Sequence, residues 1–149
     1  MRRLPTWAAA ALAASLALAA APFEVRVTGR DFRWHILYPG PDGRLDTPDD
    51  LRALQHLHLP ARTKIELDLR SDDYVYGLNL PDLDAADLAV PGRPFVMEFR
   101  TEGPGTYRLL GNQMCGGRHP ELIGDLVVLT PEAFGEWSAD SAGPGRARP

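Results

Sequence analysis

The sequence has 149 residues, which is enough for one compact domain with its own core and too few for two domains of ordinary size. Its 14 glycines, 14 prolines and 44 % hydrophobic residues exclude a coiled coil or a low-complexity chain and favour a turn-rich β protein with little helix. The formal net charge of −4 argues against nucleic acid as a partner and favours a cationic partner.

The N-terminal segment has the pattern of an export signal. Two arginines follow Met1 and precede a run rich in alanine and leucine that reaches residue 21, where A-x-A patterns offer cleavage sites. We expect residues 1–22 to be either a cleaved signal peptide or a retained transmembrane anchor. Both alternatives place the domain, residues 23–137, outside the cytoplasm. The single cysteine, Cys115, rules out an intrachain disulfide.

The domain is punctuated into short runs of β-forming residues, which predicts an all-β sandwich of the Greek-key kind. The predicted strands cover residues 24–29, 31–38, 54–58, 64–70, 74–79, 86–90, 94–100, 105–110 and 122–129. In the second of these runs, large apolar side chains alternate with others, so one face should belong to the core. The residues of this face are Phe32, Trp34, Ile36 and Tyr38. His35 points the other way and is predicted to be exposed.

No strand is predicted in the loop at residues 39–50 or at the C-terminal end. The loop is acidic but lacks the Asp-x-Asp-x-Asp-Gly order of a calcium loop, so we do not assign it to calcium. Thr130 can cap a helix whose first residue is a proline, which predicts a short helix over residues 131–137. The small and polar composition of residues 138–149 predicts a disordered tail.

One loop combines residue types that can hold a metal. Cys115 and His119 are four residues apart on a glycine-containing loop at residues 111–122, so a thiolate and an imidazole could turn toward one point. Soft metals such as copper are held in this way. The alternative is that the cysteine is a small buried apolar residue and the histidine a hydrogen-bonded loop residue.

Several short motifs follow one another in a characteristic order along most of the domain. They include GRDFRWHILYPGPDG at residues 29–43, GPGTY at residues 103–107 and CGGRH at residues 115–119. The further matching segments are residues 59–61, 71–73, 90–93 and 129–134. In these motifs the sequence resembles subunit II of the haem-copper cytochrome oxidases. The resemblance implies an exported cupredoxin domain that holds a dinuclear copper centre.

The copper ligands that the resemblance implies are mostly absent. The upstream histidine position of the family is Tyr76 in this sequence, the first cysteine position is Gly111 and the methionine position is Leu122. Only Cys115 and His119 match the family's ligands. Since two thiolates bridge the copper ions in the family, a chain with one thiolate should not form the dinuclear centre.

Two hypotheses for the site remain open. Under both, Phe32 stands where the family has its electron-entry tryptophan, so that residue of the family's usual electron route is missing. In the first, Cys115 and His119 hold one copper ion, with a third donor from Tyr76, Met114, Glu121, His56 or His58. The two alternating histidines of this set should share one strand face. In the second, the site has decayed and the domain persists as a copper-free structural or docking subunit.

The partners that the resemblance implies are a haem-copper oxidase catalytic subunit and a cationic electron donor such as cytochrome c. The domain would then transfer electrons in respiration without catalysis of its own. A free periplasmic copper carrier is the rival function, and it requires that the leader be cleaved. No nucleophile elbow or phosphate-binding loop is found in the sequence.

Overall fold

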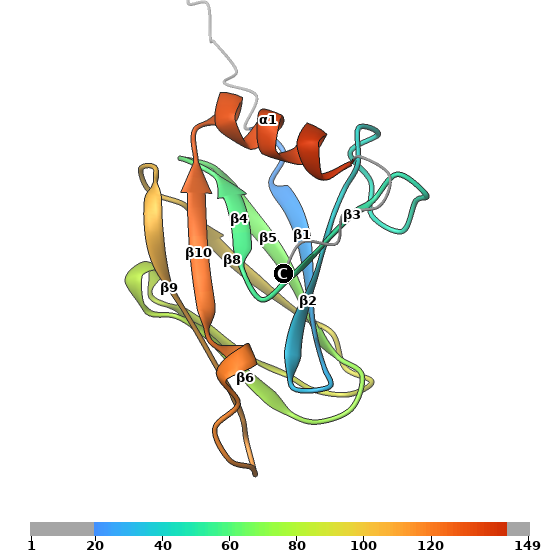
Figure 1. The fold of residues 1–149 in the computed structure, drawn as a ribbon, viewed down its shortest axis with the longest axis vertical. Helices are drawn as coiled ribbons and strands as arrows, with labels where there is room; N and C mark the ends of the chain where they lie inside the picture. The colour runs from blue at the N-terminus through green and yellow to red at the C-terminus, as the bar shows by residue number, and fades with distance from the viewer. Residues whose placement is uncertain (1–19, 143–149) are drawn as a thin grey trace, which may run out of the picture.

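The computed structural model describes residues 20–142, which form two β-sheets around one hydrophobic core (Figure 1). The strand order of the first sheet is β3 (Leu51–Leu54), β2 (Arg33–Tyr38), β1 (Phe23–Arg30), β5 (Lys64–Ser71) and β8 (Phe95–Arg100). The order of the second sheet is β4 (Leu57–Pro60), β10 (Gly124–Leu129), β9 (Gly105–Gln113), β6 (Tyr76–Leu80) and β7 (Ala85–Ala89). The predicted all-β sandwich is confirmed.

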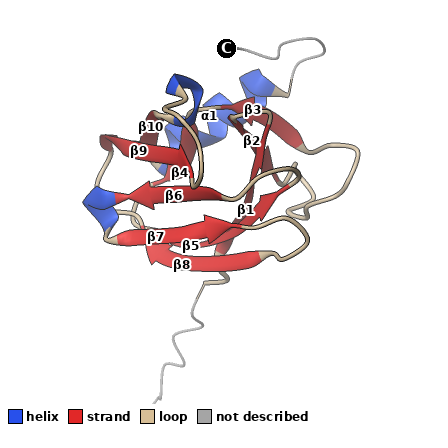
Figure 2. Cartoon of the chain, turned by 90° about the horizontal axis from the view of Figure 1, so that it is seen from below, coloured by secondary structure: helices blue, strands red, loops and turns tan. Residues whose placement is uncertain are grey.

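Helix occupies little of the described chain, as Figure 2 shows. It is limited there to α1 (Pro131–Ser141) and to two 3₁₀ turns, η1 (Pro81–Leu83) and η2 (Pro120–Leu122). The second turn removes Leu122 from the predicted last strand, which begins only at Gly124. Strand β9 in turn extends to Gln113, three residues beyond the prediction.

The alternation of apolar and polar residues builds the core. In β5 the side chains of Ile65, Leu67 and Leu69 are fully buried, while those between them face outward. Trp34 on β2 is fully buried in the same way. Phe32 does not follow this alternation, because it precedes β2 with a left-handed φ of 59° and is only half-buried. It packs against the core as a partly buried residue, but outside the alternation of β2.

The predicted strand at residues 54–58 is two strands in different sheets. Gln55 adopts a left-handed φ of 66°, and its backbone N–H donates to the Trp34 carbonyl at 2.9 Å. The chain bends there and passes from β3 in the first sheet to β4 in the second. His56 lies in this bend, whereas His58 lies on β4, so the predicted shared strand face is wrong.

Helix α1 covers one end of the sandwich (Figure 1). Its N-terminus is as predicted, because the Thr130 hydroxyl accepts a hydrogen bond from the Ala133 N–H at 3.2 Å. It ends at Ser141 rather than at residue 137, so the first residues of the expected tail are helical. The expected leader up to residue 19, and the tail from residue 143, lie outside the described residues. Between residues 20 and 142 there is no helix with the length and apolarity to cross a membrane.

Replacing Trp137 by alanine should lower the free energy of unfolding by about 2–3 kcal/mol. The indole packs on the rings of His58 and Tyr38, at centroid distances of 4.4 and 5.1 Å. Burial lowers the pKa of His58, so removal of the indole should raise this pKa toward its ordinary value. Urea unfolding and an NMR titration of the imidazole measure the two effects.

The lowered pKa of His58 also predicts how the stability of the domain depends on pH. The unfolded chain binds the His58 proton more readily than the folded chain, so wild-type stability should decrease as the pH falls through about 6.5. Trp137→Ala should flatten this decrease. Glu136→Ala, at an exposed position of the same helix, is the control and should change neither quantity. Equal effects of the two substitutions would contradict the packing role of Trp137.

Candidate metal centre

The loop that carries Cys115 lies between β9 and η2, at the end of the sandwich opposite α1 (Figure 1). The Cys115 thiol is exposed, and two glycines follow it. This exposure is compatible with the prediction that the Cys115 thiolate and the His119 imidazole could turn toward one point. The alternative interpretation of Cys115 as a small buried residue is wrong.

His119 is held by an aromatic stack. Its ring lies on Phe32 with a centroid distance of 4.0 Å and an interplanar angle of 14°. Phe32 stacks in turn on Tyr74 at 5.2 Å. The left-handed backbone of Phe32 places its ring between the two, outside the alternation of β2. The imidazole is therefore half-buried against apolar surface.

Tyr76 is fully buried, and its hydroxyl already has two partners. It donates to Asp73 Oδ1 at 2.7 Å and accepts a hydrogen bond from the Phe32 backbone N–H at 3.2 Å. Burial, together with the Asp73 carboxylate, raises the pKa of Tyr76 to about 12. A phenolate ligand to copper would have to form against both effects, and its formation would break the bond to Asp73.

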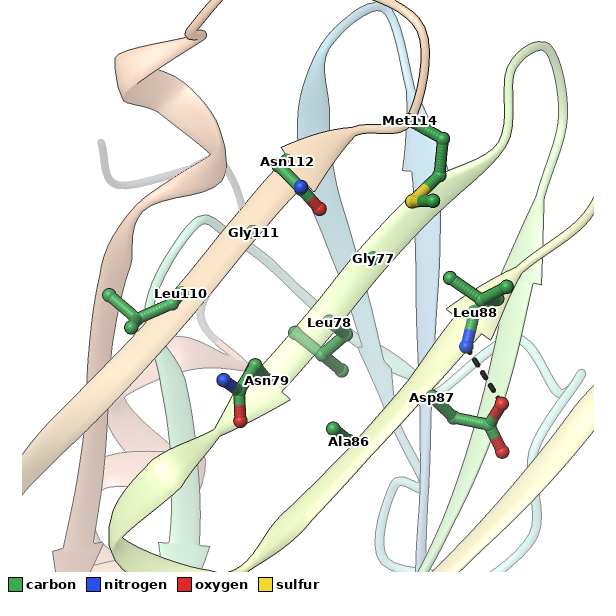
Figure 3. Close-up of a pocket in the computed structure, with 10 residues that line it drawn as sticks. All are labelled: Gly77, Leu78, Asn79, Ala86, Asp87, Leu88, Leu110, Gly111, Asn112 and Met114. Atoms are coloured by element: carbon green, nitrogen blue, oxygen red, sulfur yellow. Dashed lines mark hydrogen bonds between the residues drawn. The ribbon is translucent and has the colours of Figure 1, made fainter.

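Met114 points away from Tyr76. Strand β6 pairs with β9 so that Tyr76 lies opposite Gln113, the last residue of β9, and Met114 follows in the turn. Figure 3 shows the Met114 sulfur on the outer face of the sheet, in a groove of about 440 Å³ that Gly77 and Leu88 also line. Tyr76 and Met114 were both predicted as copper ligands, and the sheet separates them.

The other predicted donors are also dispersed. Glu121 is exposed on η2. His56 accepts a hydrogen bond from the Asp125 backbone N–H through Nδ1 at 3.1 Å. His58 stacks on Trp137 of α1, at the far end of the sandwich. Within residues 20–142, no three His, Cys, Asp or Glu side chains are grouped closely enough to hold a metal ion.

Gly111, at the family's first cysteine position, is closed to any side chain. The Trp34 indole Nε1–H donates to the Leu122 carbonyl at 2.9 Å, and both residues are fully buried. A Cβ atom at residue 111 would lie 2.5 Å from Trp34 Nε1 and closer still to the Leu122 oxygen. The Trp34–Leu122 hydrogen bond therefore occupies the space that a second thiolate would need.

The described residues therefore lack the second thiolate of the dinuclear centre that the resemblance implies, and they bring no third His, Cys, Asp or Glu donor to the predicted single-copper site. A dinuclear centre needs a second thiolate, and a trigonal mononuclear centre needs a second imidazole beside the Cys115 thiolate and His119. The sequence analysis placed Trp34 in the core but missed that its indole closes over Gly111. The alternation of residues 32–38 indicated the burial of the indole. Nothing in the pattern indicated which residue of the other sheet it contacts.

Comparisons with known proteins agree with the resemblance. No protein-family profile matches the sequence. The chain is 28 % identical over 113 residues to cytochrome c oxidase subunit 2 of Thermostichus vulcanus, covering 76 % of this chain and 32 % of that protein. It is 26 % identical over 136 residues to alternative cytochrome c oxidase subunit 2 of Bradyrhizobium diazoefficiens, covering 76 % and 49 % respectively. The chain thus spans between a third and a half of the length of these relatives.

A solved structure shows the same fold. The periplasmic domain of cytochrome oxidase subunit II of Bradyrhizobium japonicum superimposes with a TM-score of 0.69 at 18 % identity, covering 82 % of this chain and 94 % of that one. The predicted cupredoxin-like sandwich is confirmed. The described residues form a subunit II-like cupredoxin domain.

Introducing a cysteine at Gly111 should destabilise the domain by about 1–3 kcal/mol, because the new side chain overlaps the Trp34 indole and the Leu122 carbonyl. Gly117→Cys is the matched control. It adds the same thiol to the same loop region, where a Cβ meets no atom within 4 Å. Its stability should stay within about 0.5 kcal/mol of wild type. Urea unfolding under reducing conditions makes the comparison, and an equally stable Gly111→Cys variant would contradict it.

Proposed function

We propose that this domain is the extracytoplasmic, subunit II-like part of a haem-copper oxidase complex, and that it works as a copper-free structural or docking domain. The observation that carries the proposal is the buried hydrogen bond from the Trp34 indole to the Leu122 carbonyl across Gly111. The similarity to subunit II supports the place in an oxidase. The filled ligand positions support a role that does not pass through a metal.

The residues at the three altered positions support a packed end of the sandwich. Leu122 offers copper no side-chain donor and is fully buried. Tyr76 is fully buried and bonded to Asp73, so it ties the β6 strand to the turn before it. Each altered position thus carries a group that contributes to packing or to the backbone network. These residues therefore stabilise the fold. A metal ligand would instead need a donor atom that is free to coordinate the metal.

The predicted partners have different roles under this proposal. The domain would dock on the surface of a haem-copper oxidase catalytic subunit. A cationic electron donor such as cytochrome c could still bind a chain of net charge −4. Without a metal the domain would bind such a donor without accepting its electron. The extracytoplasmic location and the membrane attachment are parts of the same proposal.

Metal analysis tests the copper-free assignment. Protein loaded with excess copper and then dialysed against a chelator should retain far less than one copper ion per chain, without a thiolate-to-copper absorption band. Cys115→Ser and His119→Ala should give the same result as wild type, because no third His, Cys, Asp or Glu side chain is grouped with these two in the described part of the chain. One copper ion per chain that both substitutions remove would instead support the single-copper site and the copper-carrier function. Two ions per chain with a mixed-valence resonance would overturn the assignment of Gly111.

Purification of the full chain tests the oxidase assignment independently. A tagged chain, expressed in its natural host and extracted from membranes with detergent, should co-purify with a haem-bearing catalytic subunit recognised by its absorption spectrum. Trp34→Phe removes the indole N–H and so leaves the Leu122 carbonyl unbonded. This variant should co-purify less as its stability falls. Recovery of wild-type chain alone, in the osmotic-shock fraction, would contradict the oxidase assignment and favour a free periplasmic protein.

A further inference from the structure

The outer face of the first sheet carries a cleft of about 500 Å³ that neither the sequence analysis nor the proposed function uses. Thr28 on β1 lies opposite His35 on β2 at its centre, because the two residues are paired in the antiparallel register. Four arginines from three strands surround this pair. They are Arg26, Arg30, Arg52 and Arg70.

Two of the arginines are neutralised by the chain itself. Arg26 donates to both carboxylate oxygens of Asp46, at 2.6 and 3.0 Å, and its Nε–H donates to Asp68 at 2.8 Å. Arg70 donates to the same Asp68 through Nε and Nη2. The Asp46 carboxylate reaches the cleft from the loop between β2 and β3. This contact shows that a carboxylate can accept two parallel hydrogen bonds from a guanidinium group at the rim of the cleft.

The other two arginines have donors to spare. Arg52 is exposed, and among the described residues no carboxylate lies within ion-pair distance of it. Arg30 reaches Asp72 only at 3.4 Å, between two half-exposed side chains. Its remaining contact is to His35 Nδ1, at 3.2 Å.

This last contact fixes where His35 carries its proton. A guanidinium can only donate, so Nδ1 accepts, and the neutral imidazole must carry its hydrogen on Nε2. Nε2 is buried and has no hydrogen-bond partner in the described part of the chain. Burial and the neighbouring Arg30 lower the pKa of His35, which keeps the ring neutral at pH 7. His35 is therefore half-buried, not exposed as predicted, and it has an unused N–H.

The cleft also has an apolar part. Leu37 and Leu54 line it and are half-buried. Leu37 is paired with Arg52, and Leu54 with His35, so apolar and donor groups alternate across β2 and β3. We propose that this cleft binds a small organic monoanion, whose carboxylate accepts from Arg52 and Arg30 and whose apolar part lies on Leu37 and Leu54.

The charges at the rim select for a single negative charge. Asp46 and Asp72 also line the cleft, so a nucleic acid strand or another polyanion would meet two carboxylates. A short fatty acid or a similar aliphatic carboxylate needs only the spare donors of Arg30 and Arg52. Inorganic phosphate could use the same donors but would gain nothing from the leucines.

NMR titration of the full chain with hexanoate tests the proposal, with hexanamide as the uncharged analogue and inorganic phosphate as the ion without an apolar part. Hexanoate should shift the Arg52 and Arg30 Nε–H signals in a saturable manner, hexanamide should not, and phosphate should bind more weakly. Arg52→Gln and Arg30→Gln should each weaken hexanoate binding roughly fivefold to tenfold. Arg118→Gln, which removes an equal charge from the loop after β9, should leave binding unchanged.

Three results would overturn the proposal. One is the absence of saturable shifts at either reporter in wild-type protein. Another is equal weakening by Arg52→Gln and Arg118→Gln, which would indicate attraction by net charge alone. The third is phosphate binding as tight as hexanoate, which would leave Leu37 and Leu54 without a role. The amide spectra of the variants verify that each substituted protein is folded.

Discussion

The hydrogen bond between the Trp34 indole and the Leu122 carbonyl joins the two sheets at the end of the sandwich that carries the Cys115 loop. It connects β2 of the first sheet to the turn η2 that precedes β10 of the second. Both groups are buried, so breaking the bond would leave a polar atom without a partner in apolar surroundings. While this bond is in place, there is no room for a side chain at residue 111, so only glycine fits there.

A second network works toward the same end. The Tyr76 hydroxyl links Asp73, in the turn after β5, to the backbone of Phe32, in the turn between β1 and β2. Phe32 in turn supports the ring of His119. A side chain at Gly29 would overlap the Tyr76 ring, so this phenol fits closely against β1. Tyr76 and Leu122 stand where the resemblance implies metal ligands, and both take part instead in hydrogen bonds that hold loops together.

The distribution of charge matters more than its sum. A net charge of −4 favours a cationic partner, yet the outer face of the first sheet gathers arginines from β1, β3 and β5 around one histidine. Carboxylates from the chain neutralise only part of this group. Alternation on each strand points these side chains outward, and strand pairing places them side by side. An arginine-rich patch thus lies on a domain whose net charge is negative.

The sequence by itself determined the sandwich, the apolar face of β2 and the N-cap at Thr130, because these depend on residue periodicity and local hydrogen bonding. It also determined that the copper ligands of subunit II are incomplete, since a missing cysteine is visible in the sequence alone. Only the tertiary structure decided the bend at Gln55, the contact of Trp34 with Leu122 and the separation of Met114 from Tyr76. Each of these depends on which strands become neighbours and on the face that a side chain then occupies. Such contacts join residues far apart in the chain, and no local pattern encodes them.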